Sequence, residues 1–335
     1  MKKTIPPWSD AAAEAMKQRL SRLMKPPGSL GRLEDAAVKL AGMQDSVSIQ
    51  ADPAEVLLFA GDHGVAAAGV SPYPQQVTTM MLENFAAGSA AVNVLAGTSG
   101  VPVTAVDVGS SGELVPGVRD RRIRRGTRNL AEEAAMTIGE CRQAQEAGAS
   151  EVRRLQEKGI RLLLLGEMGI GNTTSTAALL SALTGQPAAA LTGPGTGSEG
   201  EQLERKKRIA AAAAARELGK QPEELLASLG GLETAAAAGA VEQAAALRIP
   251  VLLDGFIITT AALCAVRMNE RTADYLLAGH RSAEPGHDAA LAELGLAPLL
   301  ELEMRLGEGS GAAAAYPLLQ MAASLTKNMA LFPDD

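Results

Sequence analysis

The loop at residues 166–174 combines residue types that suit anion binding. It reads Gly-Glu-Met-Gly-Ile-Gly-Asn-Thr-Thr, follows a leucine-rich run and leads into a segment rich in threonine, serine and alanine. A turn of this kind leaves free backbone N–H groups at the start of a helix, where a phosphate binds best. Gly169, Gly171, Asn172 and Thr173 are therefore candidate phosphate ligands. The alternative is an ordinary strand-to-helix turn with Asn172 or Thr173 as its N-cap.

A second glycine-rich loop, residues 192–197, supplies further candidates. It contains Gly195 and Gly197, and the helical stretch after it contains Lys206. A lysine there could neutralise a phosphate, and a solvated helix face explains the same spacing equally well. Neither a Walker loop nor a dinucleotide fingerprint is expected at residues 166–174, because no lysine follows the last glycine and the loop follows the third predicted strand rather than the first.

Two glutamates are candidates for acid–base chemistry. Glu308 lies in Gly-Glu-Gly-Ser-Gly at residues 307–311, where the glycines let a backbone or a ligand approach closely. Glu167 lies in the first glycine-rich loop. Apolar surroundings would raise the pKa of either carboxyl toward the value that a general base needs. The alternative for Glu308 is a first-turn glutamate stabilised by the helix dipole.

The sequence gives little support for metal or covalent chemistry. The three histidines, at positions 63, 280 and 287, show no HxH or HExxH spacing, so we expect no catalytic metal. There is no Gly-x-Ser-x-Gly elbow and neither cysteine lies in a loop, so no covalent acyl intermediate is expected. We expect no cofactor.

Short apolar runs alternate with longer helical stretches, which is typical of a parallel sheet with crossover helices. Each expected strand is apolar throughout and is followed by a glycine-rich or polar loop, and ligands bind outside the carboxyl ends of such strands. The expected strands are residues 56–60, 101–106, 161–165, 249–253 and 275–278. The expected helices include residues 78–95, 131–157, 175–183 and 201–218.

The two ends of the chain have a different pattern. Residues 9–46 predict two helices separated by Lys-Pro-Pro-Gly, and helix is predicted again from about Asp288. We therefore expect a small helical lobe of residues 1–50 and 288–335 beside a Rossmann-like parallel-sheet α/β domain of residues 51–287. Alanine-rich windows, such as residues 235–238, predict closely packed helices.

Composition limits the partners and the compartment. The chain has 31 Lys and Arg against 38 Asp and Glu, which argues against nucleic acid as a partner. The six arginines from Arg119 to Arg128 predict a solvated face or loop. No signal peptide or membrane span is expected. Cys141 and Cys264 are expected to be buried free thiols of a reducing compartment, and the expected location is the cytoplasm.

Taken together, the motifs resemble the nicotinate-nucleotide–dimethylbenzimidazole phosphoribosyltransferase family. The resemblance covers essentially the whole chain. Its motifs are, in order, KPPGSLGRLE (25–34), GDHGV (61–65), SPYPQQVT (71–78), GEMGIGNTT (166–174), GPGTG (193–197), LDGF (253–256), HRSAEPGH (280–287) and LGEGSGA (306–312).

The resemblance implies a reaction in cobalamin nucleotide-loop assembly. The ribose 5-phosphate of nicotinate mononucleotide passes to 5,6-dimethylbenzimidazole, which releases nicotinate and forms α-ribazole 5′-phosphate. The resemblance also implies that Glu308 is the general base with Glu167 in support, that Ser282 binds the phosphate, and that the enzyme is a homodimer. The implied base pocket contains Ser71, Tyr73 and Met168.

Two other functions fit parts of the sequence. A pyrophosphate-dependent phosphoribosyltransferase is suggested by residues 249–260, which faintly resemble its signature but lack the paired acidic residues. A nucleotide-binding regulatory module would use the same glycine-rich loops without catalysis.

Overall fold

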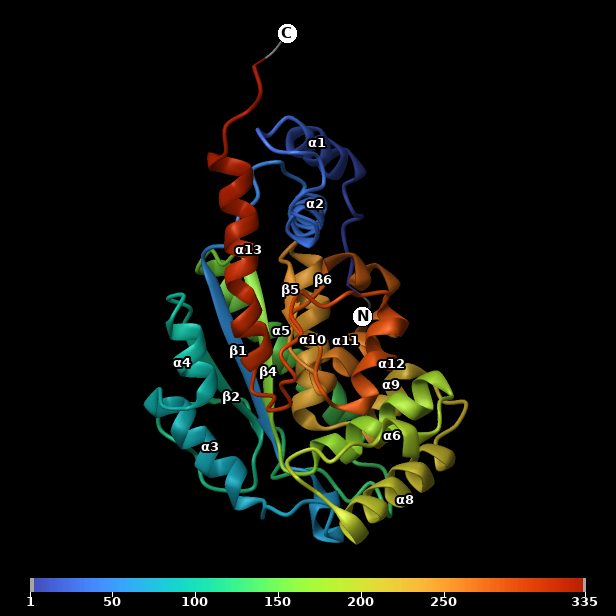
Figure 1. Ribbon diagram of the computed structural model, residues 1–335. Coiled ribbons are helices and arrows are strands. Elements are labelled where there is room, and N and C mark those ends of the chain that lie inside the picture. Colours follow the sequence, from blue (N-terminus) through green and yellow to red (C-terminus); the bar gives the residue numbers. More distant parts are fainter. Residues whose placement is uncertain (1–2, 334–335) are drawn as a thin grey trace.

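A six-stranded sheet, in which every neighbouring pair of strands is parallel, lies at the centre of the molecule (Figure 1). The structure is a computed structural model, and it describes residues 3–333. The strand order is β3-β2-β1-β4-β5-β6, which is the order of the Rossmann fold and confirms the predicted fold class. The strands are β1 (Ala54–Gly61), β2 (Val103–Gly109), β3 (Arg119–Asp120), β4 (Leu162–Met168), β5 (Val251–Leu253) and β6 (Leu276–Ala278).

All five predicted strands are confirmed. Their apolar runs are buried because helices cover both faces of the sheet, and every residue of β1 is buried. The sixth strand, β3, was not predicted. It consists of two residues that pair with the end of β2, and it lies inside the arginine-rich run.

The run was predicted to be a solvated face or loop, and residues 121–128 are indeed a loop, but several of its arginines pair with buried carboxylates. Arg119 and Arg121 donate to the buried carboxylate of Glu151, at 2.6 and 2.8 Å. Arg122 donates to the buried Asp107 at 2.7 Å. The arginines have inward partners because buried carboxylates need a positive charge nearby.

The helices follow the predicted pattern with shifted ends. The predicted helix at 78–95 is divided at Gly88, which ends α3 in a left-handed conformation. The predicted helix at 131–157 begins later, at Ile138, because Thr137 and Glu140 form a capping box there. The α-helices are α1 (Asp10–Ser21), α2 (Arg32–Gln44), α3 (Gln76–Ala87), α4 (Ala91–Gly97), α5 (Ile138–Glu157), α6 (Asn172–Thr184), α7 (Ala188–Leu191), α8 (Gly200–Arg216), α9 (Pro222–Leu229), α10 (Leu232–Ala246), α11 (Phe256–Met268), α12 (Pro285–Leu294) and α13 (Ser310–Asn328).

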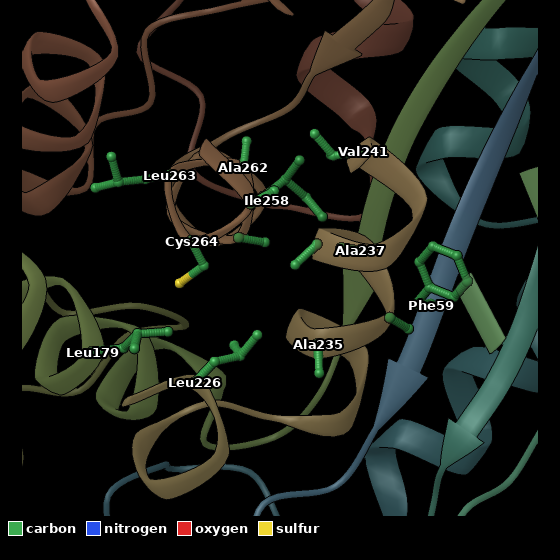
Figure 2. Close-up of a cluster of buried hydrophobic side chains, with 14 of the residues drawn as sticks. Phe59, Leu179, Leu226, Ala235, Ala237, Val241, Ile258, Ala262, Leu263 and Cys264 are labelled. Atoms are coloured by element: carbon green, nitrogen blue, oxygen red, sulfur yellow. The ribbon is translucent and has the colours of Figure 1, made fainter. Parts of the chain in front are cut away.

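The alanine-rich α10 lies at the centre of one hydrophobic core. It contacts α5, α11 and β1, and Figure 2 shows Ala235 and Ala237 between the sheet and α11. At Gly148 of α5 an added Cβ would overlap the backbone of Ala236, so only small residues allow this spacing. Close helix packing is therefore confirmed. Cys141 and Cys264 are buried free thiols, as predicted.

Three of the end helices, α1, α2 and α13, form a contiguous group, whereas α12 packs on the sheet domain. α2 contacts both α1 and α13, while α13 also contacts β4 and α4, and α12 packs on α11 and α7. An irregular segment, residues 295–309, joins α12 to α13; a break was predicted at residues 306–311, but it begins earlier, where helix was expected. The division of the chain at residues 50 and 288 stays a prediction. Among residues 3–333, no helix has the length and apolar character to cross a membrane.

Candidate active site

A cavity lies at the carboxyl ends of β4, β5 and β6, beside the point where the strand order reverses between β1 and β4. Ligands of this fold bind at such a reversal. Of the five strand-end loops singled out in the sequence, the last three line the cavity. The residues that line it are 167–170, 172–173, 195–196, 254–258, 280, 282, 284 and 305–308, so Gly171 lies just outside the lining.

Glu308 lies in the cavity wall in an unusual backbone conformation. Gly307, Glu308 and Gly309 all have positive φ, at 88°, 65° and 83°. Glycine adopts this region readily, whereas a residue with a Cβ is strained there by roughly 1–2 kcal/mol. The backbone of Glu308 rests on Gly166 of β4, where an added Cβ would lie 2.6 Å from the Glu308 carbonyl. The flanking glycines and Gly166 therefore let Glu308 reach the cavity.

Asp254, the residue after β5, holds this segment in place. Its carboxylate accepts hydrogen bonds from the backbone N–H groups of Gly309, Gly311 and Ala312, at 3.0, 2.7 and 3.2 Å. These donors belong to the first turn of α13, which has no partners for them within the helix. Asp254 therefore caps α13 and fixes the position of Glu308 at its start.

The surroundings of Glu308 suit a general base. Its side chain is buried, and its Oε2 atom has no hydrogen-bond partner among the described residues. Burial, with the neighbouring charge of Asp254 as the second cause, raises the pKa of Glu308 to about 7. A carboxyl with this pKa is ionised in about half of the molecules at neutral pH, which is the condition for efficient proton transfer.

Glu167 lies beneath the Glu308 loop. It is 3% exposed, and burial followed by the charges of Glu233 and Asp254 raises its pKa well above the usual value. Its Oε2 atom accepts a hydrogen bond from the Asn172 side chain. An added Cβ at Gly307 would lie 2.7 Å from its Oε1 atom. Glu167 therefore favours the neutral form and contacts the loop that carries Glu308.

The turn before α6 has the geometry of an anion site. Gly171 is the N-cap, with a φ of 98°, so the alternative in which Asn172 or Thr173 is the N-cap is wrong. No side chain caps the helix. The Asn172 N–H donates to the Gly169 carbonyl at 3.2 Å, which leaves the N–H groups of Thr173 and Thr174 available at the start of the helix. Lys206 of α8 is 2% exposed and donates to the Thr173 hydroxyl at 3.1 Å. The alternative of a solvated lysine was therefore wrong, and burial lowers the pKa of Lys206 to about 8.

The second glycine-rich loop lies beside this turn, because an added Cβ at Gly195 would be 2.9 Å from the Thr173 hydroxyl and 3.0 Å from Lys206 Nζ. The Gly195 N–H donates to Glu284 Oε1 at 2.9 Å, and its carbonyl accepts from Arg305 at 3.0 Å. Ser282 lines the same wall, and its hydroxyl accepts from the Glu284 N–H at 3.3 Å. Gly197, with a φ of 114°, lies outside the lining, which includes Thr196 instead.

Comparison with known proteins identifies the family. Residues 5–334 match the family model described as "Phosphoribosyltransferase". A nicotinate-nucleotide–dimethylbenzimidazole phosphoribosyltransferase of Azotobacter vinelandii is 48% identical over 333 residues, which cover 98% of this chain and 95% of that protein. One from Pseudomonas aeruginosa is 47% identical over 338 residues, with coverage of 98% and 96%. A crystal structure of such an enzyme from Thermus thermophilus superimposes with a TM-score of 0.92 at 44% identity, over 97% of both chains.

The chain belongs to the nicotinate-nucleotide–dimethylbenzimidazole phosphoribosyltransferase family. Within this family member, the structure brings one of the three predicted base-pocket residues to the cavity. Met168 lines it, together with Ile170 and Phe256. Ser71 and Tyr73 are absent from the lining: the Ser71 hydroxyl accepts from the Tyr73 N–H at 3.1 Å, and the Tyr73 side chain is 50% exposed.

Several site residues were not predicted, although some lie in loops that the sequence singled out. Asp254 and Glu284 follow β5 and β6, but no local pattern shows that one caps α13 and the other binds the 192–197 loop. Behind the site, His63 Nε2 and Glu233 Oε1 form a fully buried pair at 2.8 Å. Glu233 lies 170 residues further along the chain than His63, and no signal in the sequence connects them.

The cavity of this phosphoribosyltransferase is small and encloses about 70 Å³. Ligand pockets usually measure about 300–1,000 Å³, so the site must widen when substrates enter. A larger cavity, of about 640 Å³, lies between α1, α2 and β6. Of its two carboxylates, Glu34 and Asp35, the first is paired with Lys25 at 2.8 Å and its pKa is lowered. We place the chemistry in the smaller cavity, where Glu308 and Glu167 have raised pKa values. In the described part of the chain, no three His, Cys, Asp or Glu side chains are grouped to hold a metal ion.

Proposed function

We propose that the protein transfers the 5-phosphoribosyl group of nicotinate mononucleotide to 5,6-dimethylbenzimidazole. The products are nicotinate and α-ribazole 5′-phosphate, an intermediate for the nucleotide loop of cobalamin. One observation carries the proposal: an enclosed carboxyl with a pKa of about 7, Glu308, shares a cavity with an uncapped helix N-terminus. The names of its relatives support the choice of substrates.

The reaction requires one general base from the protein. The glycosidic nitrogen of nicotinate mononucleotide is already cationic, so the pyridine leaves with the bonding electron pair and needs no general acid. One nitrogen of dimethylbenzimidazole attacks C1′ of the ribose, and the other loses its proton to Glu308. Attack on the face opposite the leaving group converts a β-linked nucleotide into an α-linked product.

The remaining carboxylates support this base. In our proposal Asp254 holds the backbone of Glu308 through its three hydrogen bonds to the start of α13. Glu167 is neutral and supports the same loop from below, so it does not compete for the proton.

The 5′-phosphate would lie at the N-terminus of α6, against the N–H groups of residues 169–174. Lys206 and the Thr173 hydroxyl, which already contact each other, would bind it from one side. Gly195, Gly197 and Ser282 would complete the phosphate site. Gly171 is required for the turn itself, because an added Cβ would approach His63 and Val65 at 3.2 and 3.3 Å.

The proposed base pocket contains Ser71, Tyr73 and Met168. The protein forms a homodimer, as the family resemblance implies, and acts in the cytoplasm. Its partners are the two small substrates, without nucleic acid, because the net charge of −7 disfavours phosphate backbones.

A direct assay tests the function. The protein is incubated with nicotinate mononucleotide and dimethylbenzimidazole, and nicotinate and α-ribazole 5′-phosphate are quantified by chromatography and mass spectrometry. Equimolar formation of both products is expected, and only in the presence of both substrates. Binding of the nucleotide without turnover would indicate a regulatory module. Turnover only with phosphoribosyl pyrophosphate and Mg²⁺ would indicate the pyrophosphate-dependent class.

A further inference from the structure

Glu284 places a buried carboxyl in the wall of the proposed phosphate site, and the mechanism above does not use it. Its side chain is 5% exposed. Oε1 accepts the hydrogen bond from the Gly195 N–H, while Oε2 has no hydrogen-bond partner among residues 3–333. Oε2 lies against Gly193, where an added Cβ would overlap it. One oxygen of this carboxyl is therefore buried with its hydrogen-bonding capacity unused.

The charged groups around Glu284 only partly compensate for its burial. Lys206 of α8 and Arg305 of the 295–309 segment both lower its pKa, but burial has the larger effect, so the pKa is raised overall. Neither cation lies within 4.0 Å of the carboxylate as an ion pair among the described residues. His287 of α12 lies behind Ser282 and is neutral, because burial lowers its pKa to about 3. The other titratable side chains of the cavity wall are Glu167, Asp254, His280 and Glu308.

A bound phosphate would bring a second anion to this wall. The groups proposed to bind it, Lys206 and the Gly195 N–H, are the groups that now face Glu284. Two anions that share one cation and one N–H group in a buried site repel each other strongly. A neutral carboxyl removes the repulsion, and its O–H can donate to a phosphate oxygen.

We propose that nicotinate mononucleotide binds together with one proton, which Glu284 takes up from solvent. The inference rests on the proposed function, because it needs the 5′-phosphate to bind beside Gly195 and Lys206. The protonation state of Glu284 would then depend on whether the bound ligand carries a phosphate. A nucleoside without the phosphate would leave Glu284 ionised.

Calorimetry can count this proton. Binding heats are measured at pH 7.0 in two buffers with different ionisation enthalpies, and their difference gives the protons taken up per ligand. The Glu308→Gln background slows turnover and removes a carboxyl whose pKa is about 7. Lys206, with a pKa of about 8, is about nine-tenths charged at this pH, so it contributes only about 0.1 proton. The second ionisation of a phosphate monoester, near pH 6, contributes a similarly small amount.

We expect nicotinate mononucleotide to take up close to one proton and nicotinate riboside, which lacks the phosphate, close to none. With Glu284→Gln added to the background, uptake with the mononucleotide should fall to near zero. The affinity of this double variant for nicotinate mononucleotide should stay almost constant between pH 6.5 and 8. With Glu284 present, the affinity should weaken by up to about tenfold for each unit that the pH rises.

Equal proton counts for the mononucleotide and the riboside would overturn the inference, and so would a count unchanged by Glu284→Gln. The comparison of the two ligands needs no change at Glu284, so it decides the matter even if that variant does not fold. If the mononucleotide does not bind at all, the proposed function itself is wrong.

Discussion

Replacing Glu308 with glutamine should abolish most of the activity and, at the same time, stabilise the fold. The amide keeps the shape of the side chain but cannot accept the proton from dimethylbenzimidazole. Loss of a general base lowers turnover by roughly 10²–10⁴, which corresponds to about 3–5 kcal/mol of transition-state stabilisation. Because the pKa of Glu308 is about 7, the unchanged protein should lose about tenfold in rate per pH unit below pH 7 and reach a plateau above it.

The stability effect has the opposite sign. A carboxyl whose pKa rises from 4.5 unfolded to about 7 folded binds its proton more tightly in the folded protein. Stability from this group is therefore complete below pH 4.5 and is lost as the pH rises through 7. The loss at pH 8 is about 3 kcal/mol, from 1.36 kcal/mol per pKa unit. Glu308→Gln removes this penalty, so it should stabilise the protein at pH 8 much more than at pH 5.

Two measurements check this reasoning. Nicotinate release is followed from pH 5.5 to 8.5, and urea unfolding is recorded at pH 5 and pH 8. Glu301→Gln, an exposed glutamate seven residues earlier, is the matched control and should change neither quantity. A glutamine variant with near-normal turnover at pH 8 would remove Glu308 from the mechanism. Stabilisation of equal size at both pH values would show that Glu308 is not a buried acid of raised pKa.

Three other changes test the rest of the site. Lys206→Ala should weaken nicotinate mononucleotide binding by about 1.5–3 kcal/mol and leave dimethylbenzimidazole binding unchanged, both measured by calorimetry. Lys207, the neighbouring lysine, is paired with Glu204, and an equal effect from Lys207→Ala would contradict a specific role of Lys206. Gly171→Ala should destabilise the fold by about 1–2 kcal/mol, because alanine is strained at a φ of 98°; an unchanged urea midpoint would contradict this. Activity should survive exhaustive EDTA treatment, and a loss that zinc or magnesium restores would revive a metal-dependent mechanism.

Local patterns were enough to predict the sheet. The strand at 56–60 is a continuous apolar run and the strand at 161–165 has four leucines after Arg161, a pattern that fits few places other than a sheet covered on both faces. β3 could not be predicted because its two residues, Arg119 and Asp120, lie among arginines with no strand pattern. Their partners are the end of β2 and Glu151 of α5, which no window of sequence around them contains.

Candidate site residues could be predicted where the residues next to them in the sequence are distinctive. Glu308 stands out because glycines flank it, and Glu167 because it lies in a glycine-rich turn. The environment that makes each useful comes from far along the chain. Asp254 caps a helix 55 residues away, and Glu284 accepts from a loop 89 residues before it. Such a helix cap or buried carboxyl forms only when the chain is folded, so it cannot be inferred from the composition of the sequence.

The cap formed by Asp254 has a consequence for synthesis of the protein on the ribosome. Asp254 emerges well before the three N–H groups that satisfy its carboxylate, which belong to residues 309–312. Until α13 docks, the nascent chain has strands β1 to β6 and the turn before α6, but it has an unmet acceptor at the end of β5 and no base. Translation interrupted between α12 and α13 therefore yields a chain that lacks the proposed base, Glu308, and also lacks the α13 side chains of one hydrophobic core, among them Tyr316 and Leu319. Docking of α13 completes this core and brings Glu308 to the cavity in the same step.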